Sequence, residues 1–224
     1  MLNRYARALF GKILTPVARL LLRLGVSPDA VTLVGTLGVC FGALFFYPRG
    51  ELLWGTLFIT AFVFSDMLDG LMARSLQRSS SWGAFLDSTL DRFGDASVFS
   101  GLVLFYAFSR GGTNHTIAVL ALLCLVLGSV VSYARARAEG LGMTAAVGIA
   151  ERSERLVAVL VTTGFVGLKD LTGFGFPDEV LLVVLALLAL ASLYTVAQRI
   201  LVVRRQAFAR AAAEEGAEGS VGSE

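Results

Sequence analysis

The sequence predicts an all-α integral membrane protein in which six transmembrane helices follow an amphipathic helix that lies in the membrane interface. The first observation is composition: 56% of the 224 residues are apolar, only 16% are charged, and the mean hydropathy is +0.74. A soluble domain of this length has about a quarter of its residues charged. The second observation is a series of six apolar stretches, each near the roughly 20 residues that a helix needs to cross the hydrocarbon core. The net charge of +2 provides no basic surface that would suggest a nucleic-acid partner.

Residues 1–25 are expected to form the amphipathic juxtamembrane helix. Apolar residues recur at helical spacing between Leu2 and Leu21, and the arginines and the lysine of this segment lie off that stripe. A helix with two such faces is typical of segments that lie in the membrane interface, and Pro16 would introduce a kink. The interspersed arginines argue against a cleaved signal peptide.

Residues 26–208 are expected to form the six-span domain. The spans are predicted at residues 31–48, 52–75, 83–108, 116–138, 151–168 and 179–203. Glycine and proline, which favour turns, occupy the connections between them. After Phe208 the chain consists mainly of Ala, Glu, Gly and Ser without an apolar period, so residues 209–224 are predicted to be a disordered tail.

The basic residues are unequally distributed between the two sides of the predicted bundle. Of the 19 lysines and arginines, only Arg49, Arg110 and Lys169 fall on the side away from the termini. By the positive-inside rule both termini are cytoplasmic. We therefore expect a multi-pass protein of the cell membrane, with the polar ends of the second and third spans, and any active site there, facing the cytoplasm.

Four carboxylates lie in or beside the second and third predicted spans. Asp66 and Asp69 are three residues apart and Asp87 and Asp91 are four apart, so each pair shares a helical face. The short loop at residues 77–81 makes the two spans antiparallel neighbours whose carboxylates can converge. Acidic residues near a bilayer are usually paired, hydrated or functional. Four carboxylates close together repel one another, and oxygen-only ligands suit Mg²⁺ or Mn²⁺, so bound divalent cations are expected.

The residues between these carboxylates favour a ligand site over two plainer interpretations, interhelical ion pairs and a cation path. Gly70 and Gly83 would let a ligand approach the backbone closely, and Arg74 supplies a cation beside the acids. Asp95 lies one further turn along from Asp91, and we interpret it as a polar partner of Arg92 outside the site.

The segment from Asp66 to Asp91 resembles the signature of the CDP-alcohol phosphotransferase family. Every fixed position and every spacer is present, in the order Asp66-x2-Asp69-Gly70-x2-Ala73-Arg74-x8-Gly83-x3-Asp87-x3-Asp91. The resemblance implies transfer of a phosphatidyl-type group from a CDP-linked lipid, CDP-diacylglycerol, to an alcohol, with release of CMP.

The resemblance also implies the roles of individual residues. Two Mg²⁺ ions, or Mn²⁺ in their place, would both be bridged by Asp66 and Asp87, and Asp69 would complete one ion. Asp91 would touch the other ion and accept the proton of the attacking hydroxyl. The implied contacts with CDP-diacylglycerol are Asp29, Ala30, Val31, Thr32, Gly70, Arg74 and Ser80.

Five arginines at the predicted cytoplasmic ends of the last three spans are candidates for binding a phosphorylated acceptor. They are Arg135, Arg137, Arg152, Arg155 and Arg199. A guanidinium group grips phosphate with two parallel hydrogen bonds. The positive-inside rule alone also places arginines at these ends, and Glu151 could form an ordinary helix-surface ion pair with Arg155. Both interpretations stay open at this point.

Three further runs resemble the actinobacterial phosphatidylinositol-phosphate synthases, which are homodimers and join CDP-diacylglycerol to inositol 1-phosphate. The runs are residues 132–142, residues 149–156 and Gln198-Arg199, with Arg135 at a position where lysine is expected. The Asp-Pro-x-Ala-Asp-Lys run of many phosphatidylglycerol-phosphate synthases is absent, because Ser88 follows Asp87 and Arg92 follows Asp91. This favours inositol phosphate as the acceptor.

Other acceptors and one other class of protein remain open. Glycerol 3-phosphate is the second choice of acceptor, and a neutral alcohol such as serine or free inositol is the third. A non-catalytic membrane cation carrier would use the acids as an ion path, but it would distribute them through the membrane depth instead of gathering them at one edge. Close helix packing, as in a homodimer, is permitted by the series Gly35-x2-Gly38-x3-Gly42.

Overall fold

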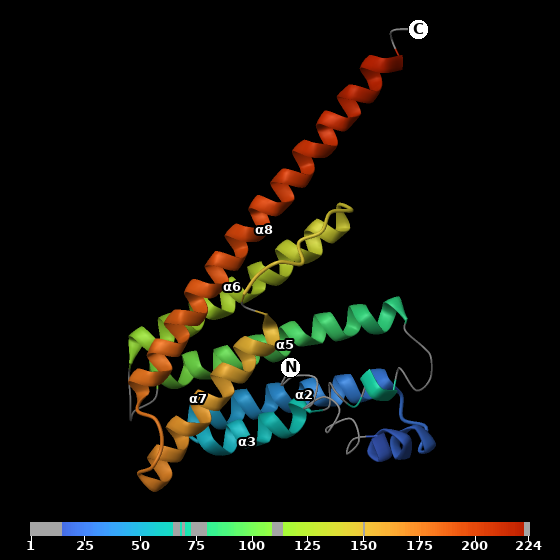
Figure 1. The fold of residues 1–224 in the computed structure, drawn as a ribbon. Helices are drawn as coiled ribbons and strands as arrows, with labels where there is room; N and C mark the ends of the chain where they lie inside the picture. Colours follow the sequence, from blue (N-terminus) through green and yellow to red (C-terminus); the bar gives the residue numbers. More distant parts are fainter. Residues whose placement is uncertain are drawn as a thin grey trace.

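A computed structural model describes residues 15–64, 68, 70–72, 80–108, 114–149 and 151–221, and the regular structure in these ranges is helical (Figure 1). The elements are α2 (Pro28–Phe46), the 3₁₀ helix η1 (Tyr47–Arg49), α3 (Leu52–Val63), α5 (Ser81–Phe108), α6 (His115–Gly140), α7 (Arg152–Thr172) and α8 (Asp178–Val221). Residues 15–23 also form a helix before α2. The first 14 residues of the predicted amphipathic helix lie outside the described ranges.

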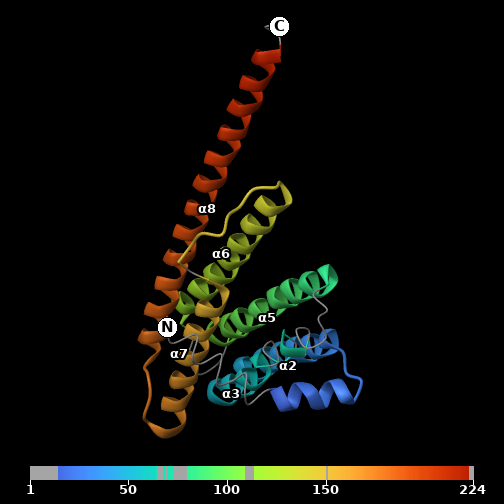
Figure 2. The same cartoon turned by 45° about the vertical axis from the view of Figure 1, so that its right-hand side comes forward.

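The helices form one bundle in which sequence neighbours and distant segments both meet. α2 packs against α3 and α5, α6 packs against α5 and α8, and α7 packs against α3 and α8. α8 continues far beyond the other helices at its C-terminal end (Figures 1 and 2). The N-terminal half of α5, the C-terminal half of α6, the start of α7 and the middle of α8 lie at the same end of the bundle, where their residues line a common cavity.

Local sequence explains where two of these helices begin. Ser27 caps α2 by accepting a hydrogen bond from the Ala30 amide at 3.2 Å, and Pro28 occupies the first helical position. α7 begins with a capping box in which Glu151 and Glu154 satisfy each other's backbone amides. This cap fixes the first turn of α7, which carries Arg152 and Arg155.

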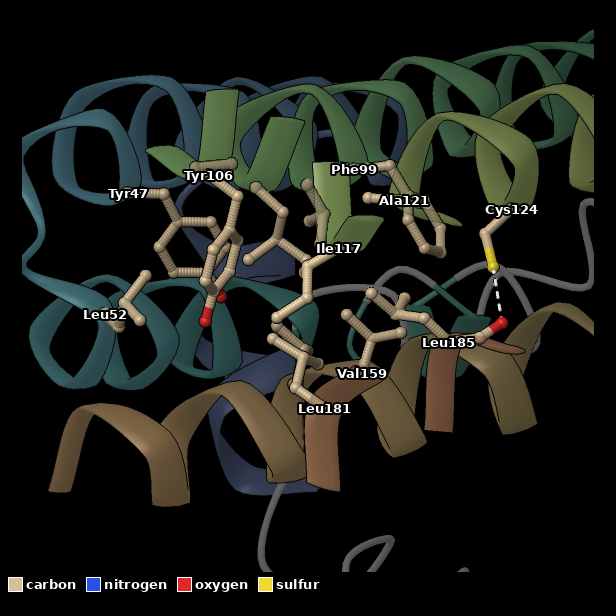
Figure 3. Packing of buried hydrophobic residues seen from close by; sticks show 14 of the residues in the cluster. Tyr47, Leu52, Phe99, Tyr106, Ile117, Ala121, Cys124, Val159, Leu181 and Leu185 are labelled. Atoms are coloured by element: carbon tan, nitrogen blue, oxygen red, sulfur yellow. Dashed lines mark hydrogen bonds between the residues drawn. The ribbon is translucent and has the colours of Figure 1, made fainter. Parts of the chain in front are cut away.

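The core lies between α2, α3, α5 and the neighbouring parts of α6, α7 and α8 (Figure 3). Tyr47, Tyr106 and Leu181 are fully buried there. Small residues let the helices approach: a Cβ at Gly101 of α5 would lie 2.5 Å from the Ala43 carbonyl oxygen of α2. Alanine at this position would therefore force the two helices apart.

Among the residues that the structure describes, three helices are long and apolar enough to cross a membrane: Pro28–Arg49, His115–Gly140 and Asp178–Ala213. Many large apolar side chains on them point outward, including Leu37 and Phe41 of α2 and Leu187 and Leu190 of α8. Outward apolar faces on long helices are what a bilayer requires, so the chain is a membrane protein. α5 and α7 are also long, but both carry charged residues, and α3 is described only over 12 residues. The count of six spans stays a prediction.

The C-terminal segment differs from its prediction. Residues 209–224 were expected to be a disordered tail, whereas α8 continues as a helix to Val221. The physical reason is that Ala211, Ala212 and Ala213 and the glutamates after them have high helix propensity, and they extend a helix whose nucleation is already provided by the bundle. Without an apolar period this segment has no face to pack against the bundle, but its residues keep their intrinsic helix propensity.

Candidate active site

A cavity of about 1070 Å³ opens at the end of the bundle where α5, α6, α7 and α8 meet. α5 contributes Asp91 and Arg92, α6 contributes Arg135, and the start of α7 contributes Arg152 and Arg155. Arg199 of α8 and the polar side chains of Ser88, Thr89, Ser129, Ser132, Glu139, Glu151 and Ser153 complete its polar wall. The cavity therefore combines one predicted catalytic carboxylate with four of the five predicted acceptor arginines.

The two carboxylates of α5 that are predicted metal ligands, Asp87 and Asp91, lie one turn apart. Asp91 lines the cavity and is partly buried, whereas Asp87 is exposed. Asp66, Asp69 and Arg74 lie outside the described residues, so the convergence of four carboxylates stays a prediction. Within the described ranges no three His, Cys, Asp or Glu residues come together as a metal-binding group. Asp87 and Asp91 supply half of the predicted ligands, and their oxygen donors fit a hard divalent cation.

Asp91 is held by arginines from two helices. Its Oδ1 lies 2.7 Å from Nη1 of Arg152 on α7, and its Oδ2 lies 3.9 Å from Nη2 of the neighbouring Arg92. The Arg152 contact is a close ion pair, much shorter than the Arg92 contact, and close charged pairs of this kind are the stronger ones. It fixes the orientation of the carboxylate at the cavity wall.

Two of the residues predicted to contact the CDP-linked lipid, Asp29 and Ser80, lie near each other where α2 and α5 begin. Ser80 Oγ accepts a hydrogen bond from the Gly83 amide at 2.9 Å. A Cβ at Gly83 would lie 3.2 Å from Ser80 Oγ and 3.8 Å from Asp29 Oδ1, so both polar side chains surround this glycine. The structure therefore brings Asp29 and Ser80 together across two helices. Neither lines the arginine cavity, and Thr32 is buried with its hydroxyl donating to the Pro28 carbonyl oxygen at 3.1 Å.

The predicted acceptor arginines have distinct surroundings. Arg135 is half exposed and pairs with Glu139 at 2.9 Å. Arg199 is 7% exposed and donates from Nε to the Val147 carbonyl oxygen at 3.0 Å and from Nη1 to that of Val131. Arg199 thus ties the loop between α6 and α7 to α6. Arg137 is exposed and does not line the cavity.

Asp95 has a more central position than the sequence indicated. Asp95 is buried, with its side chain 11% exposed, and it pairs with Arg152 Nε at 3.1 Å and Arg92 Nη1 at 3.6 Å. Arg155, only 2% exposed, places Nη2 3.9 Å from Asp95 Oδ2. The predicted link between Asp95 and Arg92 is confirmed, but both α7 arginines converge on the same carboxylate. Its spacing of four residues from Asp91 was the available signal in the sequence.

The loop between α6 and α7 is held by Gln206 and Arg210, which lie in the C-terminal half of α8. Gln206 Nε2 donates to the Thr144 carbonyl oxygen at 2.6 Å, and the Thr144 amide donates to Gln206 Oε1 at 3.0 Å. Arg210 Nη1 donates to the Leu141 carbonyl oxygen at 3.1 Å. Because this loop leads directly into Arg152, these bonds fix one edge of the cavity.

Comparison with known proteins places this geometry in a family. The family model of CDP-alcohol phosphatidyltransferases matches residues 25–161, more than half of the chain. The phosphatidylinositol phosphate synthase of Streptomyces avermitilis is 54% identical over 226 residues, which cover 98% of this chain and 91% of that protein. The synthase of the same name from Cutibacterium acnes is 46% identical, over 89% of this chain and 96% of that protein.

Solved structures agree with the sequence relatives. The Mycobacterium tuberculosis phosphatidylinositol phosphate synthase with CDP-diacylglycerol bound matches with a TM-score of 0.79 and 41% identity, over 86% of this chain and 94% of that chain. The same enzyme in complex with manganese and citrate matches with a TM-score of 0.78, over 85% of this chain and 88% of that chain. From the matched model, the identities and the shared fold, the chain belongs to the CDP-alcohol phosphatidyltransferase family.

Proposed function

We propose that the chain transfers a phosphatidyl group from CDP-diacylglycerol to a hydroxyl of 1D-myo-inositol phosphate, giving phosphatidylinositol phosphate and CMP. The observation that carries this proposal is the cavity that Asp91 lines together with Arg135, Arg152, Arg155 and Arg199. A phosphorylated alcohol needs cations for its phosphate and a base near its hydroxyl, and both kinds of group line this cavity. We leave Arg137 out of the acceptor set.

The reaction forms one P–O bond and breaks another. The acceptor hydroxyl oxygen attacks the phosphorus that carries the diacylglycerol, the bond from that phosphorus to the bridging oxygen breaks, and CMP leaves with that oxygen. Asp91 accepts the hydroxyl proton through a carboxylate oxygen. Arg152, 2.7 Å from Asp91, orients this carboxylate. Buried and half-buried arginines along the wall hold the acceptor phosphate so that the hydroxyl is aligned for attack.

The chain uses a divalent metal, as its family membership and the manganese complex of the M. tuberculosis synthase indicate. We propose two Mg²⁺ ions, with Mn²⁺ able to replace them. Asp66 and Asp87 would ligate both ions, Asp69 one and Asp91 the other. When bound, divalent ions neutralise the pyrophosphate and stabilise charge on the leaving group.

The proposed CDP-diacylglycerol contacts are Asp29, Ala30, Val31, Thr32, Gly70, Arg74 and Ser80. The meeting of Asp29 and Ser80 around Gly83 supports them, since it places polar side chains from two helices beside a glycine. A residue without a side chain lets a nucleotide approach the backbone. The binding of CDP-diacylglycerol by the M. tuberculosis synthase of the same fold also supports this assignment.

We further propose that six spans cross the cell membrane, that the cavity faces the cytoplasm, and that the enzyme is a homodimer. The position of Arg135, Arg152 and Arg199 at one end of the bundle supports the cytoplasmic orientation, because basic residues gather on that side of membrane proteins. The acceptor is then drawn from the cytosol.

An acceptor panel tests this function. Purified protein is incubated with CDP-diacylglycerol, Mg²⁺ and, separately, inositol phosphate, glycerol 3-phosphate, serine or free inositol, while CMP and the lipid product are measured. We expect CMP release with inositol phosphate to exceed that with each other alcohol. Activity with glycerol 3-phosphate alone, or with free inositol alone, would overturn the acceptor. Metal flux through proteoliposomes without CMP release with any alcohol would instead indicate a cation carrier.

A further inference from the structure

Asp95 lies beneath the cavity wall at the centre of an arginine cluster. Three guanidinium groups from two helices approach its carboxylate: Arg92 of α5 at 3.6 Å, Arg152 of α7 at 3.1 Å and Arg155 of α7 at 3.9 Å. Asp95 as a whole residue is 8% exposed. Asp95 itself does not line the cavity, whereas all three arginines do.

Each of these arginines makes a second contact that defines its direction. Arg152 reaches Asp91 with Nη1, and Arg92 donates to Ser132 Oγ on α6. Arg155 passes directly against α6, because a Cβ at Gly128 would lie 3.1 Å from its Nη2. Asp95 therefore contacts all three arginines at the place where their side chains also meet Asp91 of α5 and the residues of α6.

Electrostatics explains why a carboxylate is needed at this point. Three guanidinium groups packed between helices repel one another, and the cost rises with burial. Arg155, at 2% exposure, is the most deeply buried of the three. One buried negative charge shared by all three lowers this repulsion and restricts each side chain to a conformation that points along the wall.

We propose that Asp95 is a positioning residue for acceptor binding: it sets Arg152 and Arg155 in the geometry that receives the acceptor phosphate. This inference rests on the proposed function, because it takes these arginines as the phosphate-binding groups. Asp95 acts through them and does not touch the substrate. Through Arg152 it also supports the orientation of Asp91.

A purely structural role for Asp95 predicts different behaviour. If the carboxylate only joined α5 to α7, its loss would lower thermal stability and the amount of active enzyme, with both KM values unchanged. If Asp95 positions the arginines, its loss weakens acceptor binding selectively. The KM for the acceptor would rise and the KM for CDP-diacylglycerol would not.

The experiment compares Asp95→Asn with a matched control, Asp178→Asn. Asp178 lies at the other end of the bundle, where it accepts a hydrogen bond from the Tyr106 hydroxyl at 2.9 Å. We expect Asp95→Asn to raise the KM for inositol phosphate about tenfold or more, since charged hydrogen bonds are lost. The KM for CDP-diacylglycerol should change little. Asp178→Asn should lower the unfolding temperature and leave both KM values unchanged.

Competitive inhibition by inorganic phosphate is a second measurement of the same site. It is expected to compete with inositol phosphate in the wild-type enzyme, and Asp95→Asn should raise its inhibition constant by the same factor as the acceptor KM. Asp95→Glu keeps the charge but displaces it by one methylene, so it should restore part of the acceptor affinity. If Asp95→Asn does not fold, Asp95→Glu replaces it in the test. Its acceptor KM should then be higher than that of the wild-type enzyme, by less than the rise of about tenfold expected for Asp95→Asn.

The outcomes separate this inference from the proposed function. If the wild-type enzyme does not use inositol phosphate, the proposed function fails. If it does use inositol phosphate and the Asp95 variants fold with unchanged acceptor KM and phosphate inhibition, the positioning role of Asp95 is wrong. A rise of both KM values by the same factor would also overturn it.

Discussion

The two ends of the helical bundle bury their polar groups in different ways. At the cavity end, Asp95, Arg155 and Arg199 are all less than 10% exposed, and they are held by charged pairs and by backbone carbonyl oxygens. At the other end, the buried hydroxyls of Tyr47 and Tyr106 each have one partner, Thr56 Oγ1 at 2.9 Å and Asp178 Oδ1 at 2.9 Å.

This difference suggests separate purposes: the buried charges at the cavity end serve function, and the buried tyrosine hydroxyls at the other end serve stability. Buried charges cost desolvation energy and often contribute no more stability than apolar side chains of the same volume. We therefore infer that the arginines and aspartates at the cavity end serve the proposed substrate site, either directly or, like Asp95, through a neighbour. Tyrosine hydroxyls with one partner add modest stability to a core that is otherwise apolar. Substitutions should affect catalysis at one end and stability at the other.

The largest effect is expected from Asp91→Asn. The amide does not accept the proton of the attacking hydroxyl, and general-base catalysis contributes on the order of 10²–10⁴ in rate. We expect CMP release to fall by about that factor or more, while binding of CDP-diacylglycerol is largely retained. CMP release and lipid-nucleotide binding should be measured on the same preparation. Near-normal CMP release by this variant would remove Asp91 as the base.

A smaller effect, on the acceptor KM, should distinguish Arg152 from Arg137, two arginines at the cavity end of the bundle. Arg152→Gln should raise the KM for inositol phosphate about tenfold or more, because a charged contact to phosphate is lost. Arg137→Gln is the matched control: Arg137 is exposed and outside the cavity, so its KM should stay within about twofold of wild type. Equal effects of the two substitutions would mean that the charge of this end as a whole, and not the cavity wall, attracts the acceptor.

The acceptor arginines also show what the sequence could and could not predict. Helical spacing and the positive-inside rule were enough to predict that Arg135, Arg152, Arg155 and Arg199 lie at one end of the bundle. Arg135 and Arg137 are two residues apart on α6, and successive helical residues turn by about 100°, so the two side chains diverge. Helical periodicity alone could therefore have indicated that Arg135 and Arg137 do not point to the same site.

The proposed role of Asp95 needed the structure, because its partners Arg152 and Arg155 lie on α7 and only the tertiary fold brings them to α5. Sequence spacing within α5 pointed only to Arg92. The bounds of α2, α6 and α7 followed closely from apolar length and turn residues, whereas the end of α8 did not, since helix propensity carries it past its apolar stretch. Asp66 and Asp69 stay predictions from the family signature.

The loop of the cavity end offers a third test, at Gly148. Its φ of 138° lies in a region that other residues rarely adopt, and a Cβ there would collide with Thr195 Cγ2. Gly148→Ala should therefore cost about 1–3 kcal/mol of stability and raise the acceptor KM, because the loop leads into Arg152. Gly140→Ala is the control, since Gly140 is helical and a Cβ there meets no atom within 4 Å. Unfolding temperature and acceptor KM report the two effects.

The smallest effect is expected at the other end, from Tyr106→Phe. The substitution removes only the hydroxyl that donates to Asp178, so it should cost about 1 kcal/mol of stability, the usual value of one hydrogen bond. Turnover and both KM values should stay at wild-type levels, because neither Tyr106 nor Asp178 lines the cavity. The unfolding temperature in detergent and the kinetics of CMP release would be measured together. A change in acceptor KM without a change in stability would show that the two ends are coupled through α5, which carries both Asp91 and Tyr106.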